Sequence, residues 1–231
     1  MWYTQRAKRL LPLVSISAIA YELLLLIHYW VYGNTWSNIA VTIWGTVITS
    51  LGIQEGWVLV NPGVNNPTWY ISVRLACYVV FYLITKLAHK CHFSPAYCYI
   101  GMVLLGIGII TYGIKLPFMN SQIARGYYSF FYGLLLANYI KMFGVTKRSS
   151  GFSMCCILLL LGIFLTSTDK FQEELVWLLT FLFYPALIIL FETDAVKYIF
   201  RHKIWQIISQ ISFDVYIWHT VLFVYGKLEI Q

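Results

Sequence analysis

The sequence consists largely of long apolar stretches, which limit the possible folds more than any other feature. Eight of them lie at residues 13–32, 36–53, 67–85, 96–114, 126–143, 152–168, 174–191 and 209–226. A helix of about 20 apolar residues can cross the hydrocarbon core of a bilayer, and helices satisfy their own backbone polar groups in lipid. The sequence therefore predicts an all-α, polytopic transmembrane helical bundle. We expect a single membrane domain over residues 1–231, with no soluble domain.

Charged residues are too few to cover the surface of a soluble domain. Of the 231 residues, 11% are charged and 60% are hydrophobic, whereas soluble domains have about 25% charged and about 45–50% apolar residues. The 18 Tyr, 15 Phe and 9 Trp residues suit the aromatic belts at membrane surfaces. The net charge of +7 is explained by cytoplasmic loops rich in Lys and Arg. We therefore expect the lipid bilayer as a partner, and no nucleic acid.

The distribution of Lys and Arg predicts the topology. Three basic residues precede the first window, none lies in 33–66, and the basic loops 86–95, 144–151 and 192–208 follow. If every window crossed the membrane, these loops would lie opposite the basic N-terminus. They share its side if the window 36–53 makes no net crossing, as the positive-inside rule favours. We expect a cytoplasmic N-terminus and seven crossings, with 36–53 re-entrant or lying along the outer face; eight crossings are the alternative.

The cysteines and histidines predict no metal site. The number of cysteines is odd and no C-x-x-C pair occurs, so neither a disulfide framework nor a zinc ribbon is indicated. The spacing of His89, Cys91 and His92 fits no closed tetrahedral site. We expect no bound metal and no bound cofactor.

Three charged residues lie well inside apolar windows: Glu22, Arg74 and Asp214. Each costs about 2.5–3.5 kcal/mol at the centre of a membrane helix, so each needs a partner or a wet cavity. One interpretation is a substrate path or an acid–base site. The other is a structural ion pair, such as Arg74 with Asp214 or with Glu22.

Two histidines are candidates for chemistry. His28 lies near the outer end of the first window, about 240° around a helix from Glu22, which favours an interfacial position over a shared site. His219 follows Asp214 at about 140°, too far for a direct pair on one helix. Both residues could border a cavity shared with other helices, so catalysis and structural hydrogen bonding stay open for His219 and Asp214.

Arg6 and Arg9 are one helical turn apart at the basic end of the first window. Two guanidinium groups at this spacing can bind phosphates in bidentate fashion. The alternative is a topology signal that contacts anionic lipid headgroups. The sequence contains no phosphate-binding glycine loop, nucleophile elbow or H-E-x-x-H helix.

Four segments together resemble motifs of the acyltransferase family 3 integral membrane proteins. Residues 6–12 resemble the family's R-x-x-R-x-x-P segment, and residues 66–73 (N-P-T-W-Y-I-S-V) resemble its tryptophan-serine region in a W-Y-I-S form. Residues 125–133 are similar to its arginine-glycine helix, and residues 211–219 (I-S-F-D-V-Y-I-W-H) to its I-S-Y-x-x-Y-L-W-H signature.

The resemblance implies a membrane O-acyltransferase with about ten helices. Such proteins move an acyl group, commonly acetyl from acetyl-CoA, to a hydroxyl of a surface glycan or of its lipid-linked precursor. Arg6 and Arg9 would then bind the acyl-CoA donor. The substrate-cavity candidates that the motifs supply are Trp69, Ser72, Arg74, Arg125 and Tyr216.

The chain departs from the family in the helix that carries the catalytic histidine. That histidine follows an arginine by eleven residues, whereas Ser17 precedes His28 at this spacing. We therefore expect a shortened member that lacks the first two helices and the last one, with His219 and Asp214 as weak candidates for the base. A non-catalytic remnant or partner subunit is the second hypothesis, and a small transporter is the third.

Overall fold

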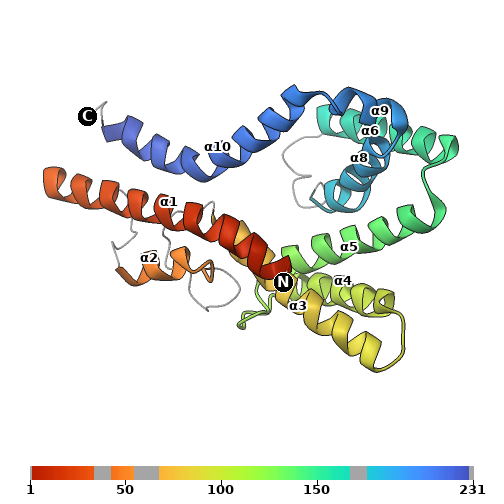
Figure 1. The fold of residues 1–231 in the computed structure, drawn as a ribbon, viewed down its shortest axis with the longest axis horizontal. Helices are drawn as coiled ribbons and strands as arrows, with labels where there is room; N and C mark the ends of the chain where they lie inside the picture. The colour runs from red at the N-terminus through yellow and green to blue at the C-terminus, as the bar shows by residue number, and fades with distance from the viewer. Residues whose placement is uncertain (1, 34–42, 55–67, 167–175, 229–231) are drawn as a thin grey trace. The chain divides into compact units, whose positions relative to one another are not determined.

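The computed structural model describes residues 2–33, 43–54, 68–166 and 176–228, and these are helical almost throughout (Figure 1). The elements are α1 (Trp2–Tyr32), α2 (Ile43–Ser50), α3 (Trp69–Lys90), α4 (Pro95–Thr111), α5 (Ser121–Phe143), α6 (Lys147–Thr166), the π-helix η3 (Leu179–Phe183), α8 (Tyr184–Phe191), α9 (Asp194–Phe200) and α10 (Lys203–Leu228). Within these residues there is no strand, only an isolated bridge between Leu116 and Met119. The all-α prediction is confirmed for this part of the chain.

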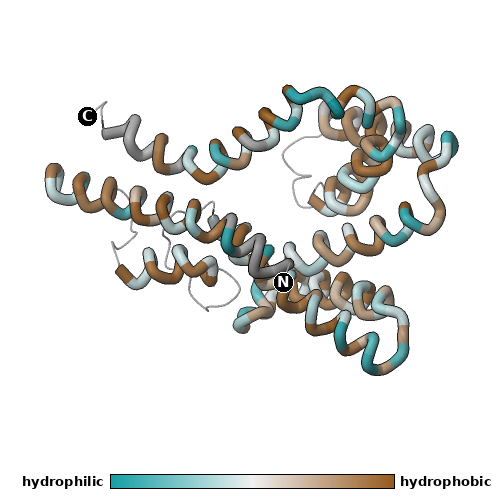
Figure 2. Tube along the Cα trace, in the orientation of Figure 1, coloured by the Kyte–Doolittle hydropathy of each residue, from teal (hydrophilic) through white to brown (hydrophobic). Residues whose placement is uncertain are grey.

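By length and hydropathy, 3 helices of the described chain could cross a membrane: Leu10–Tyr32, Trp69–Lys90 and Lys147–Phe164. A fourth span arises if Val176–Phe191 and Asp194–Phe200, which are bent by 79°, are counted together. This number is lower than the predicted seven or eight. Part of the difference lies in α4, which at 17 residues is shorter than a typical span. Polar residues also make α5 and α10 less apolar, and Figure 2 shows the polar positions interrupting the apolar ones.

The window 36–53 contains only a short helix in its described part. α2 has 8 residues, so it is about 12 Å long, against about 30 Å for the hydrocarbon core. The chain turns at Gly52, whose φ of +66° is in the left-handed region that favours glycine. A Cβ at Gly52 would lie 2.8 Å from Leu75 Cδ1 and 2.9 Å from Leu11 Cδ2. α2 packs against α1, the turn at Gly52 lies between Leu11 and Leu75, and α2 is too short to cross a bilayer alone.

The chain divides into two compact units. Unit 1 comprises residues 1–128 and 210–231, and unit 2 comprises residues 129–209. The prediction of one membrane domain over residues 1–231 stays a prediction.

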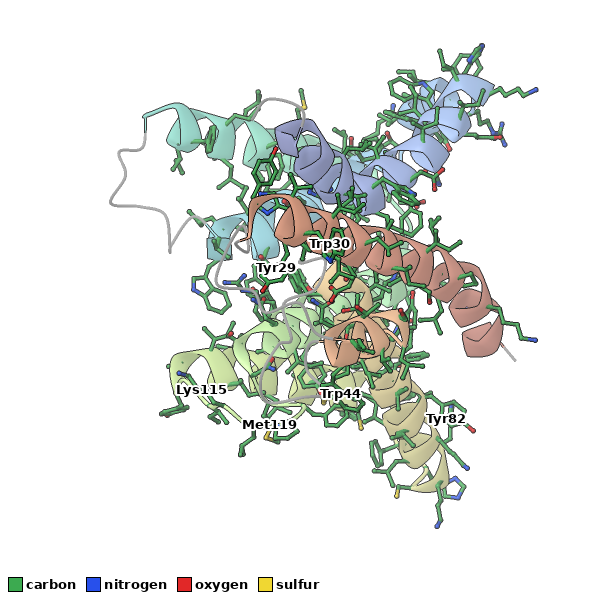
Figure 3. The ribbon with its side chains drawn as sticks, turned by 90° about the vertical axis from the view of Figure 1, so that its left-hand side faces the viewer. Tyr29, Trp30, Trp44, Tyr82, Lys115 and Met119 are labelled. Atoms are coloured by element: carbon green, nitrogen blue, oxygen red, sulfur yellow. The ribbon has the colours of Figure 1, made fainter. Side chains whose placement is uncertain are left out.

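In unit 1, aromatic side chains are exposed on several helices. Tyr29 and Trp30 on α1 are 51% and 91% exposed, Trp44 on α2 is 69% exposed and Tyr82 on α3 is 62% exposed. Figure 3 shows these side chains at the surface of the unit. Tyr and Trp at such positions can contact lipid with the ring while the polar atom reaches the interface.

The interior of unit 1 joins helices that are distant in sequence. Ala18, Tyr21 and Leu25 of α1 form a buried cluster with Val221 of α10, and Trp218 packs against it. Helix ends are capped locally: the Asn120 side chain accepts from the backbone N–H of Ile123, at 2.9 Å, where α5 begins.

Two glycines bring α5 close to its neighbours in unit 1. A Cβ on Gly126 would collide with Val73 Cγ1 and lie 3.0 Å from Cys77 Sγ, both on α3. A Cβ on Gly106 of α4 would lie 2.8 Å from the Ala124 carbonyl oxygen of α5. Small residues at helix contacts let backbones approach closely, which drives helix packing in lipid.

In unit 2, α6 packs against η3 and α8. The carbonyl group of Phe181 lies in the π-helical turn η3, just before Pro185, which has no backbone N–H to donate. The Tyr132 hydroxyl donates to this carbonyl oxygen at 3.3 Å, and the two rings lie 5.2 Å apart. A side chain of α5 therefore satisfies the backbone where the helix is irregular.

We predict that Gly126→Ala destabilises the protein by about 1–3 kcal/mol, because the added Cβ overpacks the contact with α3. Gly133→Ala is the matched control: it lies on the same helix, and a Cβ there meets nothing within 4 Å. That control should be neutral or stabilising, by up to about 1 kcal/mol, because alanine favours helix. The measurement is the thermal or denaturant unfolding midpoint in detergent, and equal effects of the two substitutions would contradict the packing at Gly126.

Candidate functional site

Three of the four motif segments contact one another in unit 1. The Tyr70 ring, at the start of α3, meets the Tyr216 ring of α10 edge-on at 6.4 Å between centroids. Trp69 lies 6.4 Å from Tyr70, also edge-on. Val73, three residues after Tyr70 on α3, is contacted by Gly126 of the arginine-glycine segment. Segments that are about fifty and ninety residues apart in sequence thus converge around the first turns of α3.

Arg74 bonds within its own helix. Its Nε–H donates to the Tyr78 hydroxyl oxygen at 2.7 Å, and the guanidinium carbon lies 5.6 Å from the centre of the Tyr78 ring. Residues four apart on a helix share a face, which brings the two side chains together. The predicted ion pair of Arg74 with Asp214 or Glu22 is not present among the described residues; the guanidinium bonds to Tyr78 instead, and Asp214 is exposed.

The other cavity candidates of α3 and α5 differ in exposure. Ser72 is fully buried, and Trp69 is half-buried at the start of α3. Arg125 is exposed near the start of α5, beside the buried Ala124. Trp69 and Tyr216 both contact the ring of Tyr70, which lies between them in this chain of contacts. Ser72 lies inside the unit, whereas Arg125 faces outward.

On α10, the backbone orients the His219 ring. Nδ1 of His219 lies 2.7 Å from the carbonyl oxygen of Tyr216. A carbonyl oxygen only accepts, so Nδ1 carries the proton and Nε2 is the acceptor nitrogen of the neutral ring. The ring also lies 5.9 Å from the Tyr216 ring. An imidazole held in this tautomer has its basic nitrogen directed away from the helix backbone.

Asp214 and His219 are both exposed and do not form a pair. α10 is continuous over both positions, so their separation of about 140° around the helix applies. The two weak candidates for the base therefore belong to different sides of α10.

α1 buries three polar side chains whose burial the sequence reasoning missed. Ser17, Glu22 and His28 are 0%, 7% and 2% exposed. His28 was expected at the interface, but it is buried against Tyr32, with ring centroids 4.8 Å apart. Ser17 and His28 are eleven residues apart, which is about 20° around a helix, so this spacing could have indicated their common face.

A second buried polar contact joins the chain on both sides of residues 55–67. The Thr68 hydroxyl donates to Gln54 Oε1 at 2.7 Å, and both side chains are buried. No sequence pattern indicated this pair, because neither residue belongs to a periodic segment.

Arg6 and Arg9 lie on the first turns of α1, and their side chains are outside the described residues, as are Asn66 and Pro67 of the tryptophan motif. Lys8, between the two arginines, is exposed. Among the residues that the structure describes, no three His, Cys, Asp or Glu side chains come together as a metal site would require.

A comparison with known families identifies the class of the protein. A family model for the acyltransferase family 3 proteins, described as an acyltransferase domain, matches residues 1–228. The chain therefore belongs to the acyltransferase family 3, a membrane-embedded family. Searches of curated proteins and of solved structures gave no match.

We predict that Tyr78→Phe lowers stability by about 1–3 kcal/mol, because it removes the acceptor of a half-buried guanidinium N–H. Tyr82→Phe, one turn further along α3 at an exposed position, is the matched control and should change stability by less than about 0.5 kcal/mol. Unfolding midpoints in detergent measure both. If the Tyr78→Phe protein were as stable as the control, the hydrogen bond between Arg74 and Tyr78 would not contribute to the stability of the protein.

Proposed function

We propose that this protein takes part in acyl transfer at the cell membrane, from acyl-CoA to a hydroxyl of a surface carbohydrate or its lipid-linked precursor. The observation that supports this best is the convergence of the motif segments at α3, α5 and α10 in a chain of this family. Acetyl-CoA is the proposed donor, and the N-terminus is proposed to be cytoplasmic.

Donor binding is assigned to Arg6 and Arg9 on the first turns of α1. Coenzyme A carries phosphates, and two guanidinium groups one turn apart can bind them in bidentate fashion. The basic N-terminal segment also supports a cytoplasmic position for these residues by the positive-inside rule, and acyl-CoA would be available on that side.

The proposed base is His219. Its Nε2 would take the proton of the acceptor hydroxyl while the hydroxyl oxygen attacks the thioester carbonyl carbon. The carbon–sulfur bond then breaks, and coenzyme A leaves as the thiol after it receives a proton. The hydrogen bond from Nδ1 to the Tyr216 carbonyl supports this role, because in the neutral ring it leaves Nε2 as the nitrogen that can accept a proton.

The acceptor would lie near the aromatic side chains at the start of α3. Trp69 and Tyr216 are proposed to contact its apolar faces, and Arg74 to provide hydrogen-bond donors, whereas Ser72 is fully buried and Arg125 faces outward. Arg74 can do so while bonded to Tyr78, since its guanidinium has five N–H donors and uses one of them there.

The activity test is release of the coenzyme A thiol from acetyl-CoA by the purified chain, with and without a sugar acceptor. We predict that His219→Ala lowers kcat by about 10²–10⁴-fold, the usual contribution of a general base, whereas the exposed His202→Ala does not. We further expect Arg6→Gln with Arg9→Gln to raise the KM for acetyl-CoA by about tenfold, through lost phosphate contacts, with Lys8→Gln as the control. Full activity of the His219→Ala variant would contradict the proposal that His219 is the general base.

A second candidate function is a partner subunit that completes an acyltransferase with another chain. Asp214 and His219 are exposed on different sides of α10, which favours this alternative over an enclosed site within one chain. Turnover that occurs only after co-expression with a longer family member would support it.

We also propose seven crossings, with the window 36–53 making none. The length of α2 supports this, because its 8 residues are too few to span. We predict that a cysteine introduced in 54–66 reacts with a membrane-impermeant thiol reagent from outside the cell. The exposed native Cys91, expected in a cytoplasmic loop, should react only after permeabilisation; labelling of 54–66 from the cytoplasm would contradict the proposal.

A further inference from the structure

Unit 2 contains a sharp bend that presents a short amphipathic helix. The helix Val176–Phe191 and the helix Asp194–Phe200 (α9) meet at 79°. If the first helix crosses the bilayer, the second lies nearly in the plane of its surface. We call residues 191–203 the elbow.

One side of the elbow is charged. Asp194, Lys197 and Arg201 are spaced by three and four residues, so they share one face of α9. Lys197 Nζ lies 2.6 Å from Glu192 Oε2, across the bend, and both side chains are about half exposed. In the part of the chain that the structure describes, the exposed Arg201 guanidinium pairs with no carboxylate.

The other components of the elbow are aromatic. The Phe200 ring lies 4.9 Å from the Phe191 ring and 4.6 Å from the Trp205 ring. Tyr198 and Ile199 are 81% and 57% exposed. Figure 2 shows polar residues at the turn from α9 to α10, between more apolar stretches. Such a combination of cations with exposed apolar side chains is typical of helices at a membrane interface.

Charged and aromatic side chains of the elbow line one cavity of about 540 Å³. It is lined by Phe191, Asp194, Lys197, Tyr198, Phe200 and Arg201. A neighbouring cavity of about 650 Å³ shares Asp194 and Lys197 and adds Lys147 from the start of α6. An occupant of the first cavity would meet two cations and one carboxylate at the rim and phenyl rings beside them.

We propose that the elbow binds the headgroup of an anionic phospholipid. Lys197 and Arg201 bind the phosphate, and the glycerol and first chain carbons contact Phe191 and Phe200. The ion pair with Glu192 does not prevent this, because an exposed pair is weak and the ammonium has two further N–H donors. The basic residues of 192–208 are also predicted to face the cytoplasm, where the leaflet carries anionic lipids. This site is independent of the proposed acyl transfer.

The test is lipid binding to the purified full-length chain by native mass spectrometry, with phosphatidylglycerol and phosphatidylcholine of identical acyl chains. We predict that Lys197→Gln with Arg201→Gln weakens phosphatidylglycerol binding by about tenfold, from the loss of two cations near a phosphate. The matched control, Lys90→Gln with Lys115→Gln, removes the same charge from exposed positions in unit 1 and should change binding less than twofold. Arg201→Gln alone leaves the Glu192–Lys197 pair intact and should give about a threefold loss with an unchanged unfolding midpoint.

Two results would overturn the proposal. Binding of phosphatidylglycerol to the double variant as tight as to the unchanged protein, or an equal loss in the control, would show that the elbow is not the site. Displacement of the lipid by inorganic phosphate at equal concentration would identify a free phosphate as the ligand instead. A loss of lipid affinity in Phe200→Ala, with inorganic phosphate ineffective, would support the lipid.

Discussion

The close approach of α5 to α3 and α4 is the contact on which unit 1 depends. In lipid, the solvent is as apolar as the side chains, so helices associate by tight packing and internal polar contacts. Gly126 allows α5 to lie against Val73, and Gly106 allows the backbone of α4 to approach Ala124. With this packing, the arginine-glycine segment lies beside the tryptophan segment, and α10 completes the arrangement through Tyr70 and Tyr216.

The same constraint explains the polar groups inside the units. A donor or acceptor without water must find a partner in the protein. Arg74 finds Tyr78 one turn away, and Thr68 finds Gln54. In unit 2, the carbonyl oxygen of Phe181, in the irregular turn before Pro185, accepts from the hydroxyl of Tyr132. These contacts fix helix positions as well as offset the cost of burial.

Helix type and location followed from the sequence, because long apolar windows allow few other structures in a bilayer. The family was also recognisable, since its motifs are local and ordered along the chain. Contacts between side chains in the folded protein were harder to predict from the sequence. The partner of Arg74 depended on which rotamer packs against its own helix, and the burial of His28 depended on which face of α1 meets the rest of unit 1.

Apolar windows alone are insufficient to predict how often the chain crosses the membrane. A window of apolar residues at 36–53 contains a helix of 8 residues in its described part, because Gly52 turns the chain between Leu11 and Leu75. A hydropathy value averaged over a window of residues does not reveal a turn inside that window. The bend after Phe191 is similar, since polar residues follow it and the helix Asp194–Phe200 continues at 79° to the helix before it.

The tryptophan segment of α3 and the signature helix α10 contact each other directly through Tyr70 and Tyr216. A double-mutant cycle of Tyr70→Ala and Tyr216→Ala on the free energy of unfolding tests this contact, because it isolates the pair from the rest of each side chain's contacts. We expect a coupling of about 0.5–1.5 kcal/mol, the usual range for an edge-on aromatic pair. Additive effects of the two substitutions would contradict it.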